Sequence, residues 1–176
     1  MSDQVSGVNP ESVPEEGTQV FGFPNPVNEK AARVVAGCVA LLSITALATG
    51  WLWILPVLAI GFWARVLTGP TLSPLGQLAT RVVAPRLGEA REVPGPPKRF
   101  AQAIGAALTT IGSILLIFFG LQGAAIAVLA IMAVFATLES VFALCVGCQI
   151  FQVLIRVGLI PRDVCEACEN ISLRNA

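Results

Sequence analysis

The 176-residue chain contains no histidine and no tyrosine, and only 12% of its residues are charged. Soluble domains have about 25% charged residues, so this composition, with a mean hydropathy of +0.78, is typical of a membrane protein. The absence of histidine excludes mixed cysteine–histidine zinc sites but leaves the all-thiolate type open. No basic run is long enough to indicate a nucleic-acid partner.

Four apolar stretches predict an all-α fold, an integral membrane bundle of four transmembrane helices in two hairpins. The stretches are residues 31–49, 51–67, 100–119 and 124–144. Each is close to the ~20 residues, or the lower limit of ~17, that a spanning helix needs. Short glycine-containing turns join each pair, around Gly50 and at residues 120–123. Because small residues are dense in the last two stretches, we expect these two helices to form the tightest pair.

The positions of the eleven basic residues predict the orientation in the membrane. They precede or open the first helix, close the second, fill the central loop and follow the fourth. They are Lys30, Arg33, Arg65, Arg81, Arg86, Arg91, Lys98, Arg99, Arg156, Arg162 and Arg174. By the positive-inside rule, both termini and the central loop are cytoplasmic. We therefore expect a multi-pass protein of the cell inner (plasma) membrane, with the lipid bilayer as its first partner.

The sequence divides into a membrane domain and two tails. Residues 1–26 are polar, aperiodic and acidic rather than basic, which predicts a disordered cytoplasmic tail and no signal peptide. The membrane domain covers residues 27–158, with Asn28 as the expected N-cap of a helix that begins at Glu29. Residues 159–176 form the second cytoplasmic tail, which carries cysteines.

The central loop contains a candidate amphipathic helix between Thr71 and Arg86. Its apolar residues recur at intervals of three and four, and its arginines occupy other positions. We interpret it as a short interfacial helix on the membrane surface, although a plug that packs under the bundle is the alternative. The proline-rich residues 89–97 are interpreted as a stiff linker to the third helix.

Four of the five cysteines form two Cys-x-x-Cys pairs, Cys145/Cys148 and Cys165/Cys168, after the fourth apolar stretch. In the reducing cytoplasm such pairs bind metal or exchange thiols more often than they form structural disulfides. Four thiolates would favour zinc or iron, so all four cysteines are candidate metal ligands. A redox-active dithiol and inert thiols are the alternatives.

Glu139 is the one carboxylate inside a predicted span, so we expect it to pair with a cation or to be protonated. Arg65, at the matching depth, is the expected partner. If the cysteines are redox-active, the candidate catalytic groups are Cys145, Cys148 and Glu139, with Glu139 as a proton acceptor. Otherwise Glu139 is a buried polar anchor between helices.

The helix dipole bears on which thiol ionises. Cys145 is expected at a helix C-terminus, whose partial negative charge disfavours a thiolate. If the helix breaks at Gly147, Cys148 opens the next helix. We therefore expect Cys148 to be the more acidic thiol and the better nucleophile.

Several short motifs carry a resemblance to a known family. They are Gly69-Pro70, Ala84-Pro85-Arg86-Leu87-Gly88, Arg99-Phe100-Ala101-Gln102 and Cys145-Val146-Gly147-Cys148. With them the chain resembles, from roughly Val27 to Cys168, the domain-of-unknown-function family 4395, small membrane proteins well represented in actinobacteria. The resemblance implies an integral membrane protein with a thiol motif at a helix end, and it implies no established activity.

Three functional hypotheses follow from these features. The first is a membrane adaptor that is not a self-contained enzyme, whose cytoplasmic cysteines bind zinc or iron or carry thiol-linked groups. The second is a thiol–disulfide oxidoreductase that links a cytoplasmic thiol or sulfur carrier protein to the quinone pool. The third is an accessory subunit of a larger membrane complex.

The metal hypothesis predicts a stoichiometric metal after anaerobic purification. Zinc and iron per chain are measured in the wild-type protein and in a variant with Cys165→Ser and Cys168→Ser, which removes two of the four expected ligands. We expect bound metal to be lost in the variant. Substoichiometric metal that is the same in both proteins would contradict a four-cysteine site.

Overall fold

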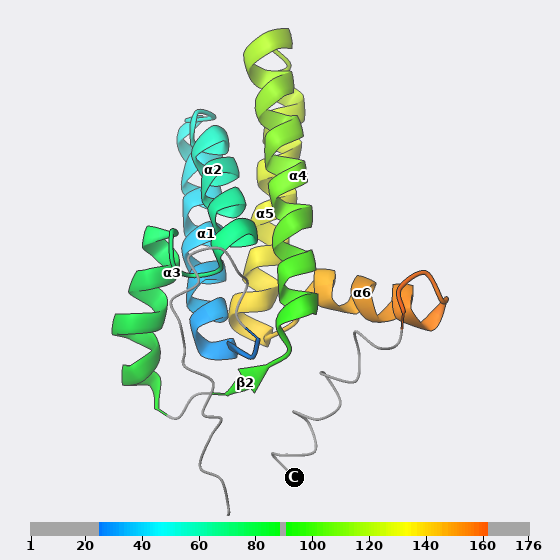
Figure 1. Ribbon diagram of the computed structural model, residues 1–176. Coiled ribbons are helices and arrows are strands. Elements are labelled where there is room, and N and C mark those ends of the chain that lie inside the picture. Colours follow the sequence, from blue (N-terminus) through cyan, green and yellow to red (C-terminus); the bar gives the residue numbers. More distant parts are fainter. Residues whose placement is uncertain (1–24, 89–90, 162–176) are drawn as a thin grey trace, which may run out of the picture.

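The computed structural model describes residues 25–88 and 91–161, and they are mostly helical, as predicted. Figure 1 shows α1, α2, α4 and α5 running alongside one another, with α6 projecting sideways from them near one end. The elements are β1 (Val27–Asn28), α1 (Glu29–Thr49), α2 (Ile54–Thr68), α3 (Pro74–Leu78), the π-helical turn η1 (Ala79–Val83), the 3₁₀ turn η2 (Ala84–Leu87), β2 (Glu92–Val93), α4 (Gly95–Phe119), α5 (Gln122–Phe142) and α6 (Val146–Arg156). Apart from residues 25–26 and 159–161, the two predicted tails lie outside the described residues.

Three helices, α1, α4 and α5, are long and apolar enough to cross a membrane. The predicted second span is not confirmed, because α2 has 15 residues and is therefore about 22 Å long, against a hydrocarbon core of about 30 Å. Gly50 ends α1 in the left-handed conformation, with φ of 72°, and residues 51–53 form a turn before α2 begins. Pro56 lies in the first turn of α2, where its missing N–H costs no helical hydrogen bond.

The outer surface of the helices is apolar where that of a soluble bundle would be polar. Large apolar side chains are exposed along the middle of the helices, among them Leu41, Ile44, Ile60, Ile114, Phe118 and Val134. The buried positions between the helices are often small, among them Ala36, Ala40, Ser43, Ala106 and Ala125. A continuous apolar exterior of this kind fits contact with lipid. The protein is therefore built as a membrane-embedded protein.

The closest helix pairs differ from the predicted one. α1 packs most extensively against α5, and α2 against α4, so the expectation that α4 and α5 form the tightest pair is wrong. The glycines of α4 face α2: a Cβ on Gly105 would lie 2.6 Å from the ring of Phe62, and one on Gly112 would lie 2.9 Å from Leu55. Small residues do permit close approach here. Which helix these glycines pack against depends on the face of α4 on which they lie.

A short β ladder brings the first turns of α1 and α4 together. β1 pairs antiparallel with β2, with Val27 opposite Val93. Asn28 is the N-cap of α1, as predicted, since its Oδ1 accepts a hydrogen bond from the backbone N–H of Lys30 at 3.0 Å. The Oδ1 of Asn25 accepts from the N–H of Gly95 at 3.0 Å and so caps α4. These contacts set the charged ends of the two helices at one level.

The predicted central-loop helix is present, but it is shorter and irregular. It begins after Ser73, whose Oγ accepts from the N–H of Gly76, and it continues through α3, η1 and η2 to Leu87. Its buried residues Ala79 and Ala84 pack against Ala31 and Val35 of α1, so it lies along the side of the bundle (Figure 1). Leucine and valine side chains on its other face are exposed, namely Leu78, Val82 and Leu87.

α5 ends at Phe142, two residues before the predicted end of the span. Ala143 adopts the left-handed conformation with φ of 57°, which costs a non-glycine residue about 1–2 kcal/mol. Arg33 offsets this cost by binding the orphan carbonyls of the last turn. Its Nε and Nη2 donate to the carbonyl of Ser140 at 3.1 and 3.0 Å, and Nη2 also donates to that of Val141 at 3.2 Å.

α6 starts directly after this break and is held against α4. The ring of Phe151 packs on that of Phe100, with centroids 5.4 Å apart. Gly147 lies on the backbone of α4, because a Cβ there would come within 2.6 Å of the Cβ and 2.7 Å of the Cα of Ala101. The glycine of the Cys-Val-Gly-Cys motif is therefore required by helix packing.

Gly147→Ala should displace α6 and destabilise the protein by about 1–3 kcal/mol, the usual cost of overpacking. Gly123→Ala is the matched control, because nothing lies within 4 Å of that position in α5 and alanine favours a helix. Melting temperatures in lipid or detergent should fall for Gly147→Ala and stay constant or rise for Gly123→Ala. A Gly147→Ala protein as stable as wild type would contradict the packing described here.

Candidate functional site

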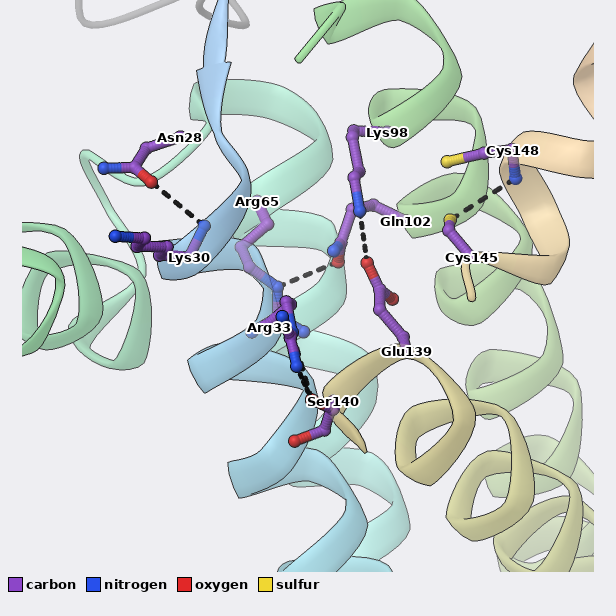
Figure 2. A network of polar contacts seen from close by, with 10 residues as sticks. All are labelled: Asn28, Lys30, Arg33, Arg65, Lys98, Gln102, Glu139, Ser140, Cys145 and Cys148. Atoms are coloured by element: carbon purple, nitrogen blue, oxygen red, sulfur yellow. Dashed lines mark hydrogen bonds and ion pairs between the residues drawn. The ribbon is translucent and has the colours of Figure 1, made fainter. Parts of the chain in front are cut away.

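The two cysteines of the Cys-x-x-Cys motif are three residues apart, which is also the spacing between a helix N-cap residue and the residue whose backbone N–H it binds. Cys145 is the N-cap of α6, with φ of −88° and ψ of 100°, and its Sγ accepts from the backbone N–H of Cys148 at 3.3 Å. A serine N-cap makes the same bond to the third residue of its helix. Figure 2 shows this contact beside the polar side chains at the charged end of the bundle. The motif therefore starts α6 as well as pairing two sulfurs.

The order of acidity is opposite to the one expected from the sequence. A hydrogen bond from the Cys148 thiol lowers the pKa of Cys145 below its usual range, helped by the charge of Lys98 and the N–H of Cys148, and opposed by burial and Glu139. The same hydrogen bond, together with burial, raises the pKa of Cys148. The prediction failed because the helix breaks at Ala143, not at Gly147. Cys145, at the positive end of α6, is therefore the more acidic of the two thiols.

Glu139 pairs with Lys98 and not with Arg65. The Nζ of Lys98 lies 2.6 Å from the Oε1 of Glu139, and the two side chains are 11% and 17% exposed. Arg65 is also buried, but its Nε donates to the Oε1 of Gln102 at 2.9 Å, and its guanidinium lies 4.5 Å from the centre of the Phe62 ring. Lysine and glutamate thus tie the first turn of α4 to the last turn of α5.

The buried cluster of Arg65, Lys98 and Glu139 holds one more positive charge than negative. Arg65 feels the charge of Glu139 although it does not contact it, so the three groups act as one electrostatic unit. A buried charge without a counter-ion is costly. Within this cluster Lys98 lowers the pKa of Cys145, but Glu139 raises it by more. The lowered pKa of this thiol therefore comes first from its hydrogen bond with the Cys148 thiol.

Cys145 and Glu139 line one small cavity, which we call the dithiol cavity. Its volume is about 90 Å³. Its polar lining comes from Arg65, Gln102, Glu139 and Cys145, and apolar side chains form the rest of the wall. Two of those apolar residues, Phe135 and Ile150, are 40% and 42% exposed, so the cavity reaches the apolar surface between α5 and α6. Cys148 is partly exposed and is not part of the lining.

The metal prediction lies partly outside the described residues. Cys165 and Cys168 fall beyond residue 161, so the structure does not test a four-cysteine site for zinc or iron. Among residues 25–88 and 91–161, no group of three or more histidine, cysteine, aspartate or glutamate side chains is placed to hold a metal. The four-cysteine site stays a prediction.

Sequence reasoning missed Lys98 as a site residue. It assigned the Pro-Gly-Pro-Pro stretch to a linker, whereas Gly95, Pro96 and Pro97 form the first turn of α4. Proline is favoured at the first helical positions, and that signal would have extended the helix to include Lys98, one turn before Gln102. Arg33 was counted only as a basic residue beside the membrane. Its role as a cap for α5 has no local signal in the sequence.

The comparisons with known proteins identify a family. A family model described as "Domain of unknown function (DUF4395)" matches residues 27–156. The chain belongs to this family. The match runs from β1 to the last residue of α6, so it contains Lys98, Glu139 and the Cys145/Cys148 pair but ends before the tail pair. The family membership expected from the sequence is confirmed. Neither the curated proteins nor the solved structures gave a match.

The ion pair should set the pH at which Cys145 reacts. Because Lys98 lowers and Glu139 raises the pKa of Cys145, Lys98→Met should move the midpoint of its alkylation to higher pH, and Glu139→Gln should move it to lower pH. The rate of N-ethylmaleimide labelling is measured against pH in a chain whose other cysteines except Cys148 are serine. Arg91→Gln, which removes only the ion pair between the exposed Arg91 and Glu29, is the control. Equal midpoints in all the proteins would contradict this electrostatic account.

Proposed function

We propose that the protein is a membrane-bound thiol–disulfide oxidoreductase whose exchanging pair is Cys145 and Cys148. The observation that supports this most directly is the position of Cys145, an N-cap thiol with a lowered pKa in the wall of a cavity that it shares with Glu139. Thiolates at helix N-termini beside a cation are the reactive kind, because the thiolate is the nucleophile. Cysteines with a purely structural, buried role have neither the helix N-terminal position nor the neighbouring cation.

The two sulfurs face different partners in this proposal. Cys148 is partly exposed and lies outside the cavity, so the thiolate of a reduced cytoplasmic thiol carrier attacks Cys148 in the Cys145–Cys148 disulfide. Cys145 leaves as the stabilised thiolate, since the thiol of lower pKa is the better leaving group. The second carrier thiol then attacks the mixed disulfide at the carrier sulfur. The carrier becomes a disulfide, and Cys148 is released as a thiol.

A quinone is the electron acceptor that the dithiol cavity fits. The cavity reaches the apolar surface at Phe135 and Ile150, and Arg65 and Gln102 supply hydrogen-bond donors at its polar end for a carbonyl oxygen. At about 90 Å³ it is smaller than the roughly 150 Å³ that holds benzene. Only the edge of a quinone ring therefore enters, with one carbonyl leading. The remaining ring and its tail stay on the apolar surface.

The redox step balances with one added proton. In the proposed reaction Cys145 starts as the thiolate and Cys148 as the thiol, and together they lose two electrons and one proton as the bond between their sulfurs forms. The quinone takes up these two electrons and two protons and becomes a quinol. One of the protons comes from the Cys148 thiol, so the second must come from elsewhere.

We also propose the finer topology of four spans in two hairpins, with the dithiol on the cytoplasmic side. The charged residues of the described helices gather at the end that carries α6 and β2, whereas the turns at residues 50–53 and 120–121 hold no charge. This asymmetry supports a cytoplasmic α6 end by the positive-inside rule. For α2, the preceding turn would complete the crossing, with the exposed Trp51 and Trp53 at the outer interface.

The other two hypotheses stay predictions. The metal-binding or thiol-carrying adaptor depends on Cys165 and Cys168, which the structure does not describe. An accessory role in a larger membrane complex depends on partners that the single chain does not contain. Neither explains why Cys145 shares a cavity with a buried carboxylate.

The proposal predicts quinone reduction in a single turnover. The reduced full-length protein in lipid nanodiscs is mixed anaerobically with ubiquinone-1, and quinol and disulfide are measured together. We expect one quinol for each Cys145–Cys148 disulfide. Cys145→Ser and Cys148→Ser should abolish both products, and Cys38→Ser should leave them unchanged. Quinol formation that survives Cys145→Ser, or no quinol from the wild-type protein, would refute the proposal.

A further inference from the structure

A second, larger cavity lies on the other side of the polar residues that end the dithiol cavity. We call it the chamber; its volume is about 280 Å³. Its polar lining residues are Asn28, Arg65, Thr80, Glu92, Lys98 and Gln102. The chamber and the dithiol cavity share Val35, Arg65 and Gln102, so these three side chains form the partition between them.

The chamber has the properties of a site for water. Apolar atoms form most of its wall, but six of its fourteen lining residues carry polar side chains, which offer both donors and acceptors to ordered water. Pro26, in its wall, is exposed, so the chamber reaches the surface at the charged end of the bundle. The dithiol cavity, in contrast, reaches the surface between apolar residues.

The Lys98–Glu139 pair crosses the partition. Lys98 lines the chamber and Glu139 lines the dithiol cavity, and Nζ and Oε1 are 2.6 Å apart. Both side chains are largely buried. Figure 2 shows Lys98 reaching down from α4 to Glu139, with Cys145 to the right of this contact and Arg65 to the left. A distance of 2.6 Å permits direct proton transfer along the hydrogen bond.

We propose that Lys98 and Glu139 relay the second proton of quinone reduction from water in the chamber to the dithiol cavity. The inference rests on the proposed function, because only an acceptor such as a quinone needs a proton that the dithiol does not supply. Lys98 acts through Glu139 and is therefore a positioning residue of the relay. Glu139 is the group that meets the reacting oxygen.

The transfer balances in three moves. Lys98 gives a proton to Glu139, and the ion pair becomes a neutral amine and a neutral carboxylic acid. Glu139 gives that proton to the reduced quinone oxygen in the dithiol cavity. Water in the chamber then reprotonates Lys98, and the pair is charged again. The net result is one proton taken from the chamber side for each disulfide formed.

Other charged and titratable groups around the pair contribute to its electrostatics. Arg65 faces it from α2, Glu92 from β2, and Cys145 and Cys148 from the start of α6. Arg33 and Cys38 lie on α1, and Cys38 acts on Arg65. Arginine keeps its proton at any working pH, and Arg65 and Arg33 therefore cannot replace Lys98 in the relay.

Lys98→Arg separates proton transfer from electrostatics, because it keeps the positive charge but does not release a proton. In the nanodisc assay with ubiquinone-1, we expect Lys98→Arg and Glu139→Gln to slow quinol formation by about a hundredfold, the lower end of what a positioned proton donor contributes. Their rates should also fall in proportion to proton concentration, since the proton must now come directly from solvent. The wild-type rate should vary much less with pH.

Three controls make the result decisive. Arg91→Gln, which changes an exposed side chain outside the lining of both cavities, should react at the wild-type rate. Lys98→Arg should keep the wild-type melting temperature and the wild-type pH midpoint of Cys145 alkylation. All variants should still form the Cys145–Cys148 disulfide with a small aromatic disulfide, which needs no relayed proton.

The failures of the relay and of the proposed function are distinguishable. If Lys98→Arg and Glu139→Gln form quinol at the wild-type rate with the wild-type pH profile, the relay is wrong and the oxidoreductase stands. If the wild-type protein forms no quinol, both proposals are wrong. If Lys98→Arg loses disulfide formation with the aromatic disulfide as well, Lys98 serves the dithiol itself and the relay is wrong.

Discussion

A carboxylate buried in an apolar helix bundle needs a cation, and the contact between Lys98 and Glu139 meets that need. Removing one partner of such a buried pair typically costs about 3–5 kcal/mol, so the pair constrains the register of α4 against α5. It also requires α4 to begin early enough to carry Lys98, which the proline-rich first turn and the Asn25 cap make possible. The charged end of the bundle is organised around this one contact.

The helix break that creates the thiol site depends on the same end of the bundle. Arg33 holds the last carbonyls of α5 while Ala143 takes a left-handed conformation, and the chain restarts with Cys145 as the N-cap of α6. Gly147 then lets α6 lie against α4. A capping bond, a close helix contact and a lowered thiol pKa thus come from four consecutive residues.

The resulting dithiol is asymmetric, and the asymmetry gives the proposed chemistry its direction. Cys145 faces a small cavity that opens at the apolar surface, whereas Cys148 is partly exposed outside it. On the far side of the partition, the chamber with its six polar side chains reaches the charged end of the bundle. The two sulfurs would therefore be reached by three separate routes. Electrons would come from a carrier, a quinone from the bilayer and a proton from water.

The sequence by itself determined the features that depend on local composition: long apolar helices, the Asn28 cap, the Cys-x-x-Cys motif and the family. These signals are local because membrane helices satisfy their own backbone and caps bind neighbouring residues. Only the tertiary structure decided that α1 packs on α5, that Lys98 replaces Arg65 as the partner of Glu139, and that Cys145 rather than Cys148 is the more acidic thiol. Each of these depends on side chains far apart in the chain, and a helix break held by Arg33 reverses the dipole argument that the sequence alone supports.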